Sequence, residues 1–341
     1  MNLKKILMAA TIAAMTAVSG LSIAQAVEIK FGIGIKEGDF PEYNALVRFK
    51  EYVEFKTNGE ITVRLFPNNQ LGGEREMIEQ VREGSLELTF PADGAMAGFY
   101  PKMQVWSIPY LFESAPIAWK VLNGEFADNM RKDILKETGI NVLAFSQNGF
   151  RSFTNNVRPI INPEDIKGLK IRVMESPVFM KLVNGLGATA TPISGSEVLL
   201  ALRQGVVDGQ ENPPAVVYGG GLGEVQKYYT LNEHVFGLHL IIANDDWLNS
   251  LSPGHQQVIK DAAALMAWTE NLQKTQGDWA FSKKLVDELG MEIHVSTPDE
   301  KAAFKAVTQA PVVEFIREQV GDELVDSLIS EVEATKVNLY K

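Results

Sequence analysis

One arginine at the end of a short apolar segment is well suited to bind an anion. Arg172 lies in the segment GLKIRV at residues 168–173. Its planar guanidinium presents paired N–H donors that match a carboxylate, and it keeps its charge at physiological pH. A single arginine at a strand end is more often part of a surface ion pair. Further along the chain, DGQENP at 208–213 predicts an acidic, amide-rich turn in front of a helix.

The N-terminus has the three parts of a secretion signal. Lys4 and Lys5 form a positive region, residues 6–18 are apolar, and Ala-Gln-Ala at 24–26 is a small-residue cleavage site. The apolar run is shorter than the ~20 residues of a membrane-spanning helix. Since the chain has no cysteine that could carry a lipid, we expect residues 1–26 to be removed and the mature protein to be periplasmic.

Composition disfavours several classes of partner. The chain has 43 acidic and 32 basic residues and a formal net charge of −11. Such a balance argues against nucleic acid and anionic membranes as partners. An anionic ligand must then be recognised by locally placed cations. The roughly 315 residues left after cleavage exceed one small core and favour two domains.

Strand and helix patterns alternate along the chain and predict an α/β fold. We expect strands at 29–35, 61–66, 86–90, 141–145, 171–173, 189–192, 206–209 and 238–244. We expect helices at 41–57, 74–83, 115–124, 125–138, 177–186, 196–204 and 253–288. This order favours right-handed crossovers and a largely parallel sheet. The last helix is long enough to cross both domains, and no low-complexity linker separates them.

The sequence lacks the motifs of common enzymes and metal sites. Its histidines form no HExxH or HxH pattern, and there is no GxSxG, no P-loop and no complete dinucleotide fingerprint. We therefore expect no cofactor, no metal and no enzymatic activity. A periplasmic hydrolase or lyase on a similar scaffold would need a nucleophile–base pair that we do not find.

A series of short motifs follows an order that is typical of one family. They are NGEI at 58–61, QLG at 70–72, GFR at 149–151, PEDIKGLKIR at 163–172, EV at 197–198, AL at 201–202 and VDGQENP at 207–213. This series resembles the DctP-type solute-binding subunits of tripartite ATP-independent periplasmic (TRAP) transporters, over about residues 28–325. The resemblance implies two α/β domains around a ligand cleft, joined by crossing strands and a long domain-spanning helix. It also implies a receptor that captures an organic anion for small and large permease subunits.

The resemblance also implies specific ligand contacts. Arg172 matches the arginine that grips the ligand carboxylate, Arg151 matches a second arginine of the pocket, and Asn212 matches an amide that hydrogen-bonds the same group. Together they could satisfy a carboxylate stripped of water, which would be costly to bury unpaired. Glu175 stands where family members carry a polar ligand contact. It either accepts a hydrogen bond from a ligand hydroxyl, which we favour, or neutralises an arginine.

Four further residues complete the predicted site. We expect Asp93 to line the domain I wall of the cleft and Asn148 to lie beside the GFR motif. His234 and His239 lie near the second crossing and are candidates for the pocket, with a structural role as the alternative for each.

Domain boundaries and ligand class follow as further expectations. We expect domain I to comprise 27–148 and about 237–276, and domain II 149–236 and about 277–341, in a monomer. The ligand stays open between a C4-dicarboxylate-like acid, a hydroxy or sugar acid, and a sulfonate, whose oxygens also fit a guanidinium. A sensory binding protein that feeds a receptor kinase is the alternative to transport.

Overall fold

The computed structural model describes residues 27–339 of the chain, and the predicted signal peptide lies outside the described residues. The strands are β1 (Val27–Gly32), β2 (Ile61–Phe66), β3 (Leu88–Thr89), β4 (Ile140–Asn155), β5 (Lys170–Val173), β6 (Thr189–Pro192), β7 (Gly209–Asn212), β8 (Tyr228–Asn244) and β9 (Glu292–Val295). The α-helices are α2 (Pro41–Lys56), α3 (Glu74–Glu83), α4 (Asp93–Met96), α5 (Ala115–Leu122), α6 (Glu125–Thr138), α7 (Pro177–Gly185), α8 (Val198–Arg203), α9 (Pro214–Gly219), α10 (Asp245–Ser250), α11 (Pro253–Asp287), α12 (Pro298–Val320) and α13 (Asp322–Leu339). None of the helices in this part of the chain is long and apolar enough to cross a membrane.

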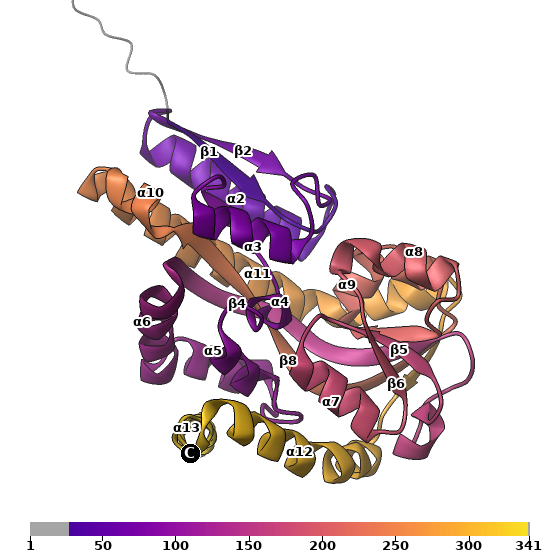
Figure 1. Ribbon diagram of the computed structural model, residues 1–341. Coiled ribbons are helices and arrows are strands. Elements are labelled where there is room, and N and C mark those ends of the chain that lie inside the picture. The colour runs from indigo at the N-terminus through magenta and orange to yellow at the C-terminus, as the bar shows by residue number, and fades with distance from the viewer. Residues whose placement is uncertain (1–26, 340–341) are drawn as a thin grey trace, which may run out of the picture.

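Two long strands form the spine of the molecule (Figure 1). β4 and β8 pair antiparallel from Ile140 opposite Asn244 to Asn155 opposite Tyr228. At one end β3, β1 and β2 extend the sheet from β8, and at the other end β7, β5 and β6 extend it from β4. The spine therefore runs through both halves of a nine-stranded sheet within residues 27–339. This arrangement confirms the expected two α/β domains with crossing strands.

The predicted strands at 61–66 and 189–192 have the bounds that the structure shows, whereas the crossing strands and the strand before α9 differ from the predictions. Parallel pairing holds within each half, for β1 with β2 and β3 and for β5 with β6 and β7. The two crossing strands are antiparallel and much longer than the predicted 141–145 and 238–244. The strand predicted at 206–209 lies three residues further on: the segment 209–212, predicted as part of a turn, is the strand β7, paired with β4. Its sequence GQEN is buried although it is polar, so apolar periodicity could not reveal it.

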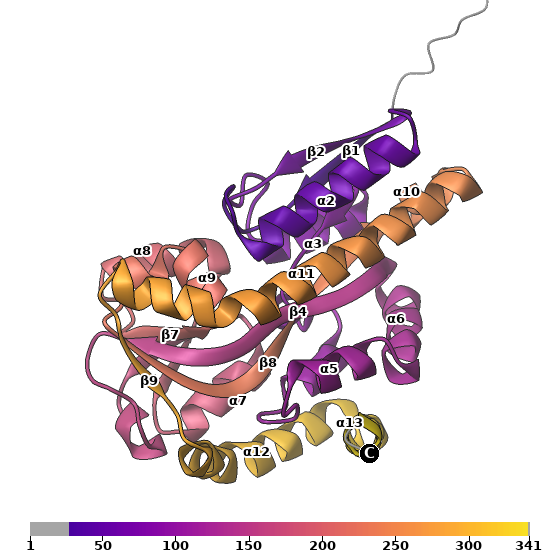
Figure 2. The ribbon, with the colours of Figure 1, turned by 180° about the vertical axis from the view of Figure 1, so that it is seen from behind.

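The helix α11 runs along the back of the spine (Figure 2) and confirms the predicted domain-spanning helix. It begins after Ser252, whose side chain accepts the N–H of His255, and Pro253 occupies its first turn. The middle of its buried face is polar: Glu270 accepts a hydrogen bond from Ser146 at 2.5 Å. Lys274 of the same face forms a buried ion pair with Glu42 of α2. α11 is thus held by buried polar bonds as well as by apolar packing.

The C-terminal helices contact both halves of the molecule. α12 packs on α7, and α13 packs on α5 and α6. The apolar cluster beneath them includes Trp106, Phe179, Phe304 and Val332. Because α5 and α6 fall in the predicted domain I, α13 contacts that domain although its own residues were assigned to domain II. The exact boundaries stay a prediction.

Asp278 of α11 generates a testable prediction about stability and pH. Its carboxyl lies close to Gly149, and its Oδ1 has no hydrogen-bond partner. Burial raises the pKa of Asp278 to about 7, so the folded protein favours the neutral acid. The contribution of neutral Asp278 to the free energy of unfolding is fully present below the ordinary pKa of aspartate and is lost as the pH rises through about 7.

We expect Asp278→Asn to stabilise the protein at pH 8 by a few kcal/mol, because one pKa unit corresponds to about 1.4 kcal/mol. The gain should shrink toward pH 5, as measured by chemical denaturation at both pH values. Asp287→Asn on the exposed side of the same helix serves as the control. An equal gain from Asp278→Asn at both pH values would contradict this account.

Candidate anion-binding site

A cavity of about 370 Å³ lies between the two halves of the molecule. Its volume is within the range of small-molecule binding pockets. Of the predicted site residues, Arg172, Arg151, Asn212, Asn148 and His239 line this cavity. The chain folding around the spine thus brings together side chains from four strands, β4, β5, β7 and β8.

Arg172 is the buried cation of this cavity. It lies in β5, which β6 and β7 flank, and it is only 4% exposed. Its Nε donates to the carbonyl of Ile193 at 2.8 Å, and among residues 27–339 no carboxylate pairs with its guanidinium at ion-pair distance. Burial lowers the pKa of Arg172 to about 10, and the neighbouring Arg151 contributes to the decrease. The side chain therefore remains charged at neutral pH without a direct counterion.

Arg151 differs from Arg172 because its charge is already balanced. Its Nε donates to Glu211 Oε2 at 2.5 Å, and its Nη2 donates to Oε1 and to the carbonyl of Glu211, both at 2.7 Å. Burial by itself raises the pKa of Glu211, but Arg151 and His234 outweigh it and hold this pKa at about 2. The Nη1 group of Arg151 is buried without a partner. Arg151 can offer that N–H group to a ligand, but not an unbalanced charge.

The sequence did not mark Glu211 as part of the site. It stands inside the GQEN segment, between amide residues that are also buried. The sequence placed two arginines in a pocket that binds one ligand carboxylate. This imbalance signals that a carboxylate of the protein must neutralise one of them. The sequence pattern alone does not say which of the many acidic residues does so.

Asn148 and Asn212 reach the cavity through local backbone geometry. The register between β4 and β8 shifts between Gln147 and Gly149, and Gly149 has a φ of 117°. Such a shift re-aims neighbouring side chains. A Cβ at Gly149 would lie 3.2 Å from Pro213. Both the positive φ and this close contact therefore favour glycine at position 149. Asn212 ends β7, and its Nδ2 donates to Gln210 Oε1 at 2.5 Å.

His239 of β8 lines the cavity, and Glu270 of α11 fixes the orientation of its ring. Its Nδ1 lies 2.7 Å from Glu270 Oε1, and its ring packs against Phe90 with a centroid distance of 4.7 Å. Because a carboxylate accepts, we assign a proton to Nδ1. Nε2 is then the ring nitrogen left for a ligand.

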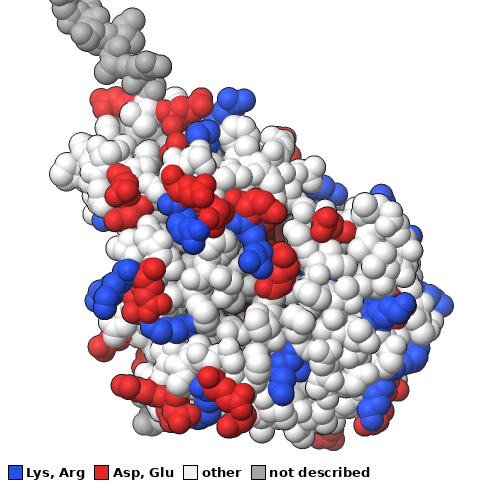
Figure 3. All heavy atoms as spheres, in the orientation of Figure 1, with Lys and Arg blue, Asp and Glu red and all other residues white. Residues whose placement is uncertain are grey.

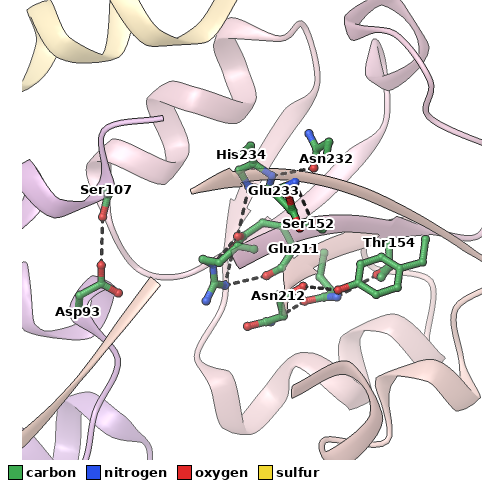
Figure 4. Close-up of polar contacts among 12 residues, drawn as sticks. Asp93, Ser107, Ser152, Thr154, Glu211, Asn212, Asn232, Glu233 and His234 are labelled. Carbon is green, nitrogen blue, oxygen red and sulfur yellow. Dashed lines mark hydrogen bonds and ion pairs between the residues drawn. The ribbon is translucent and has the colours of Figure 1, made fainter. Parts of the chain in front are cut away.

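Asp93 and His234 lie outside the wall of the cavity. Figure 4 shows Asp93 with Ser107, apart from the group around Glu211, and Ser107 donates to Asp93 Oδ2 at 3.3 Å. Burial raises the pKa of Asp93 to about 6. His234 stacks on Phe153, and its Nε2 lies 3.5 Å from Glu211 Oε2. His234 therefore supports the counterion of Arg151, which is the structural alternative considered for it.

Glu175 also lies outside the main cavity, at its rim. It pairs with Arg75 of α3 at 3.7 Å, and its side chain is 36% exposed. This ion pair links domain I to domain II, since Glu175 follows β5. The ion pair with Arg75 favours the role in which Glu175 neutralises an arginine over the role in which it accepts a hydrogen bond from a ligand hydroxyl. The arginine it neutralises is neither Arg151 nor Arg172. Gly195 lines the cavity, and a Cβ there would meet no atom within 4 Å, so glycine leaves open space in this wall.

Among the residues that the structure describes, no group of three or more His, Cys, Asp or Glu side chains is arranged to hold a metal ion. The polar atoms of the cavity are instead N–H donors, carboxamides and carboxylates. They can bind an anion and its attached polar groups through hydrogen bonds.

The two ion pairs provide a matched stability test. Glu211→Gln should destabilise the fold by about 3–5 kcal/mol, because it leaves the buried Arg151 charge without its partner. Glu175→Gln makes the same chemical change at an exposed pair and should cost less than about 1 kcal/mol. Denaturant unfolding of both variants measures the difference. Equal losses would contradict the assignment of Arg151 and Glu211 as a buried pair.

Comparison with known proteins identifies the family. The model described as "Bacterial extracellular solute-binding protein, family 7" matches residues 34–319. The chain is 32% identical over 314 residues to the C4-dicarboxylate-binding periplasmic protein DctP of Rhodobacter capsulatus, covering 91% of this chain and 92% of that protein.

Two solved structures extend this comparison. The sugar acid binding protein DctPAm from Advenella mimigardefordensis, in complex with galactonate, has a TM-score of 0.87 and 31% identity, covering 91% of this chain and 99% of that one. A TRAP periplasmic solute binding protein from Shewanella oneidensis with bound succinate has a TM-score of 0.85 and 28% identity, covering 90% and 99%. The chain therefore belongs to bacterial extracellular solute-binding protein family 7, the DctP family, and is a TRAP periplasmic solute-binding protein.

Proposed function

We propose that this protein captures a small organic anion in the cavity between its domains and delivers it to the membrane subunits of a TRAP transporter. The observation that carries the proposal is the Arg172 guanidinium, which is 4% exposed and lacks a carboxylate partner within residues 27–339. A buried unpaired charge is unfavourable. A ligand carboxylate would supply the missing counterion.

The surrounding groups fit a single anionic head group. The Arg172 guanidinium can donate in paired geometry, Arg151 adds its free Nη1, and Asn212 lies in the same wall. A sulfonate presents similar oxygens and stays an alternative to a carboxylate. The polar atoms beyond this head group, on Asn148 and His239, would contact the rest of the ligand.

The surface does not supply a broad attractive field for an anion. Acidic and basic side chains are interspersed on the face seen in Figure 3, and the whole chain is net negative. Recognition then depends on local cations inside the cavity. This favours a receptor that encloses its ligand.

Both domains contribute to that enclosure. Arg75 of domain I pairs with Glu175 of domain II, and a Cβ at Gly94 would lie 2.6 Å from Met174 Cε. We infer that the domains close over the ligand and that the crossing strands and α11 carry the bending. Asp93, His234 and Glu175 would then position the site instead of touching the ligand. The predicted leader at residues 1–26 would bring the protein to the periplasm, where its family acts.

Arg172→Lys should weaken ligand binding at least tenfold, because a point ammonium cannot reproduce the paired donor geometry. Arg172→Ala should lose more, on the order of 2–5 kcal/mol, since the desolvated anion keeps no partner. Calorimetry with an acid found by thermal-shift screening measures both. Arg158→Lys is the control, because Arg158 also donates to backbone carbonyls but lies away from the cavity. Wild-type affinity in folded Arg172→Lys would disprove the role of Arg172.

Domain closure predicts a change of size in solution. The ligand-free protein should have a larger radius of gyration than the ligand-saturated protein in small-angle scattering. Arg172→Ala under the same ligand concentration should stay at the ligand-free size. Superimposable curves for wild type, with saturation verified by calorimetry, would rule out closure as the capture step.

A further inference from the structure

Two residues that line the cavity carry a buried oxygen without a hydrogen-bond partner. They are Asn148 Oδ1 and Glu42 Oε2, and both residues are 3% exposed. Buried acceptors in folded proteins are nearly always satisfied, so an unsatisfied one at a binding cavity points to a donor that arrives with the ligand. A carboxylate ligand group brings no donor, whereas a hydroxyl does.

Glu42 is an ionised acceptor held in place by a second charge. It lies in the first turn of α2, and its Oε1 binds Lys274 of α11, which is fully buried. Burial by itself raises the pKa of Glu42, but Lys274 outweighs it and keeps this pKa below the usual value. The carboxylate is therefore an acceptor only. Its Oε2 cannot be satisfied by another carboxylate.

His239 is a further polar group of the lining. Glu270 holds its Nδ1 at 2.7 Å, which leaves Nε2 as the ring nitrogen available to a ligand. Glu74 also lines the cavity, and its Oε1 accepts the N–H of Ala92 at 2.9 Å. Glu74 lies near Arg172, with which it lines a small adjoining pocket. Glu42 and Glu74 thus add two carboxylates to the lining.

Cations elsewhere in the lining are poorly placed for a second ligand carboxylate. Arg203 is exposed and already pairs with Glu224 at 3.4 Å. Lys36 is exposed and lies over the ring of Phe40, 5.5 Å from its centroid. A dicarboxylate would therefore place its second charge against Glu42 or at the solvent-exposed mouth.

We propose that the ligand is a monocarboxylate with several hydroxyl groups along its chain, a sugar-acid-type compound. Its carboxylate binds Arg172, and its hydroxyls donate to Asn148 Oδ1 and Glu42 Oε2. The cavity of about 370 Å³ lies within the range of pockets that hold small organic ligands. This inference rests on the proposed function, because it assumes that an anion occupies the cavity.

The test compares ligands that differ only in these groups. Calorimetry of the wild-type protein is carried out with gluconate, galactonate and threonate, and with the chain-length counterparts hexanoate, butyrate, adipate and succinate. We expect at least one hydroxylated acid to bind at least tenfold more tightly than both its unhydroxylated counterpart and the dicarboxylate of equal length. A dicarboxylate that binds more tightly than all hydroxylated acids would overturn the inference.

A variant tests the acceptor directly. Asn148→Ala should weaken the best hydroxylated acid at least fivefold and leave its unhydroxylated counterpart within twofold. Asn141→Ala is the control on the same strand, and its Nδ2 bonds Asp245, far along β4 from the cavity. Glu42→Gln should give a similar selective loss, but it also breaks the pair with Lys274, so circular dichroism must first verify its fold. Equal losses for both ligands in Asn148→Ala would reject the hydroxyl contact.

The outcomes separate this inference from the proposed function. If succinate or adipate binds in an Arg172-dependent manner and the hydroxylated acids do not, only the ligand class is wrong. If no acid binds, or if Arg172→Lys does not change the affinity of an acid that does, the anion-binding function itself is wrong and the ligand class with it.

Discussion

The pairing of Arg151 with Glu211 determines the electrostatics of the cavity. Two arginines and no carboxylate in one buried pocket would repel each other and resist burial. Glu211 neutralises the charge of Arg151. Arg151 donates two hydrogen bonds to the Glu211 carboxylate and a third to the Glu211 carbonyl. Within residues 27–339, Arg172 is then a buried cation of the cavity without an ion-pair partner, and it can take one negative head group.

The same ion pair depends on the antiparallel spine. Arg151 lies on β4 and Glu211 on β7, and the ladder between these strands sets Ser152 opposite Asn212 and Phe153 opposite Glu211. His234 on β8 also lies close to Glu211, with Nε2 3.5 Å from Oε2. Since the two crossing strands pass through both domains, the floor of the site is built from the strands that join them.

The polar contacts behind the site continue into α11. Glu270 orients His239 and binds Ser146, while Lys274 holds Glu42 of α2. Buried polar networks of this kind have few alternative arrangements, because a half-satisfied network is unfavourable. Ligand hydroxyls that donate hydrogen bonds to the unpaired oxygens of Asn148 and Glu42 would therefore favour the closed arrangement over an open one. The selectivity of the cavity and its closure then have a common physical origin.

Much of the architecture could be predicted from the sequence. The helices at Glu74–Glu83 and Glu125–Thr138 and the strand at Ile61–Phe66 agree with the predictions residue for residue, because their apolar periodicity and end signals are local. The long helix from Pro253 and the motif order were equally clear, and the motif order led to the family. Arg172 could be selected as an anion-binding residue because its side-chain chemistry and its position after an apolar segment are both visible in the chain.

Tertiary structure alone decided which polar residues meet. β7 and the polar part of β4 carry no apolar pattern, so their pairing is stabilised by ladder hydrogen bonds and partner side chains from distant segments. For the same reason the sequence could not show that Glu211 neutralises Arg151, that Glu175 pairs with Arg75 at the rim, or that Glu42 lines the cavity with Lys274 behind it. Charge balance in a buried site depends on distances between segments far apart in the chain, and a one-dimensional pattern does not contain those distances.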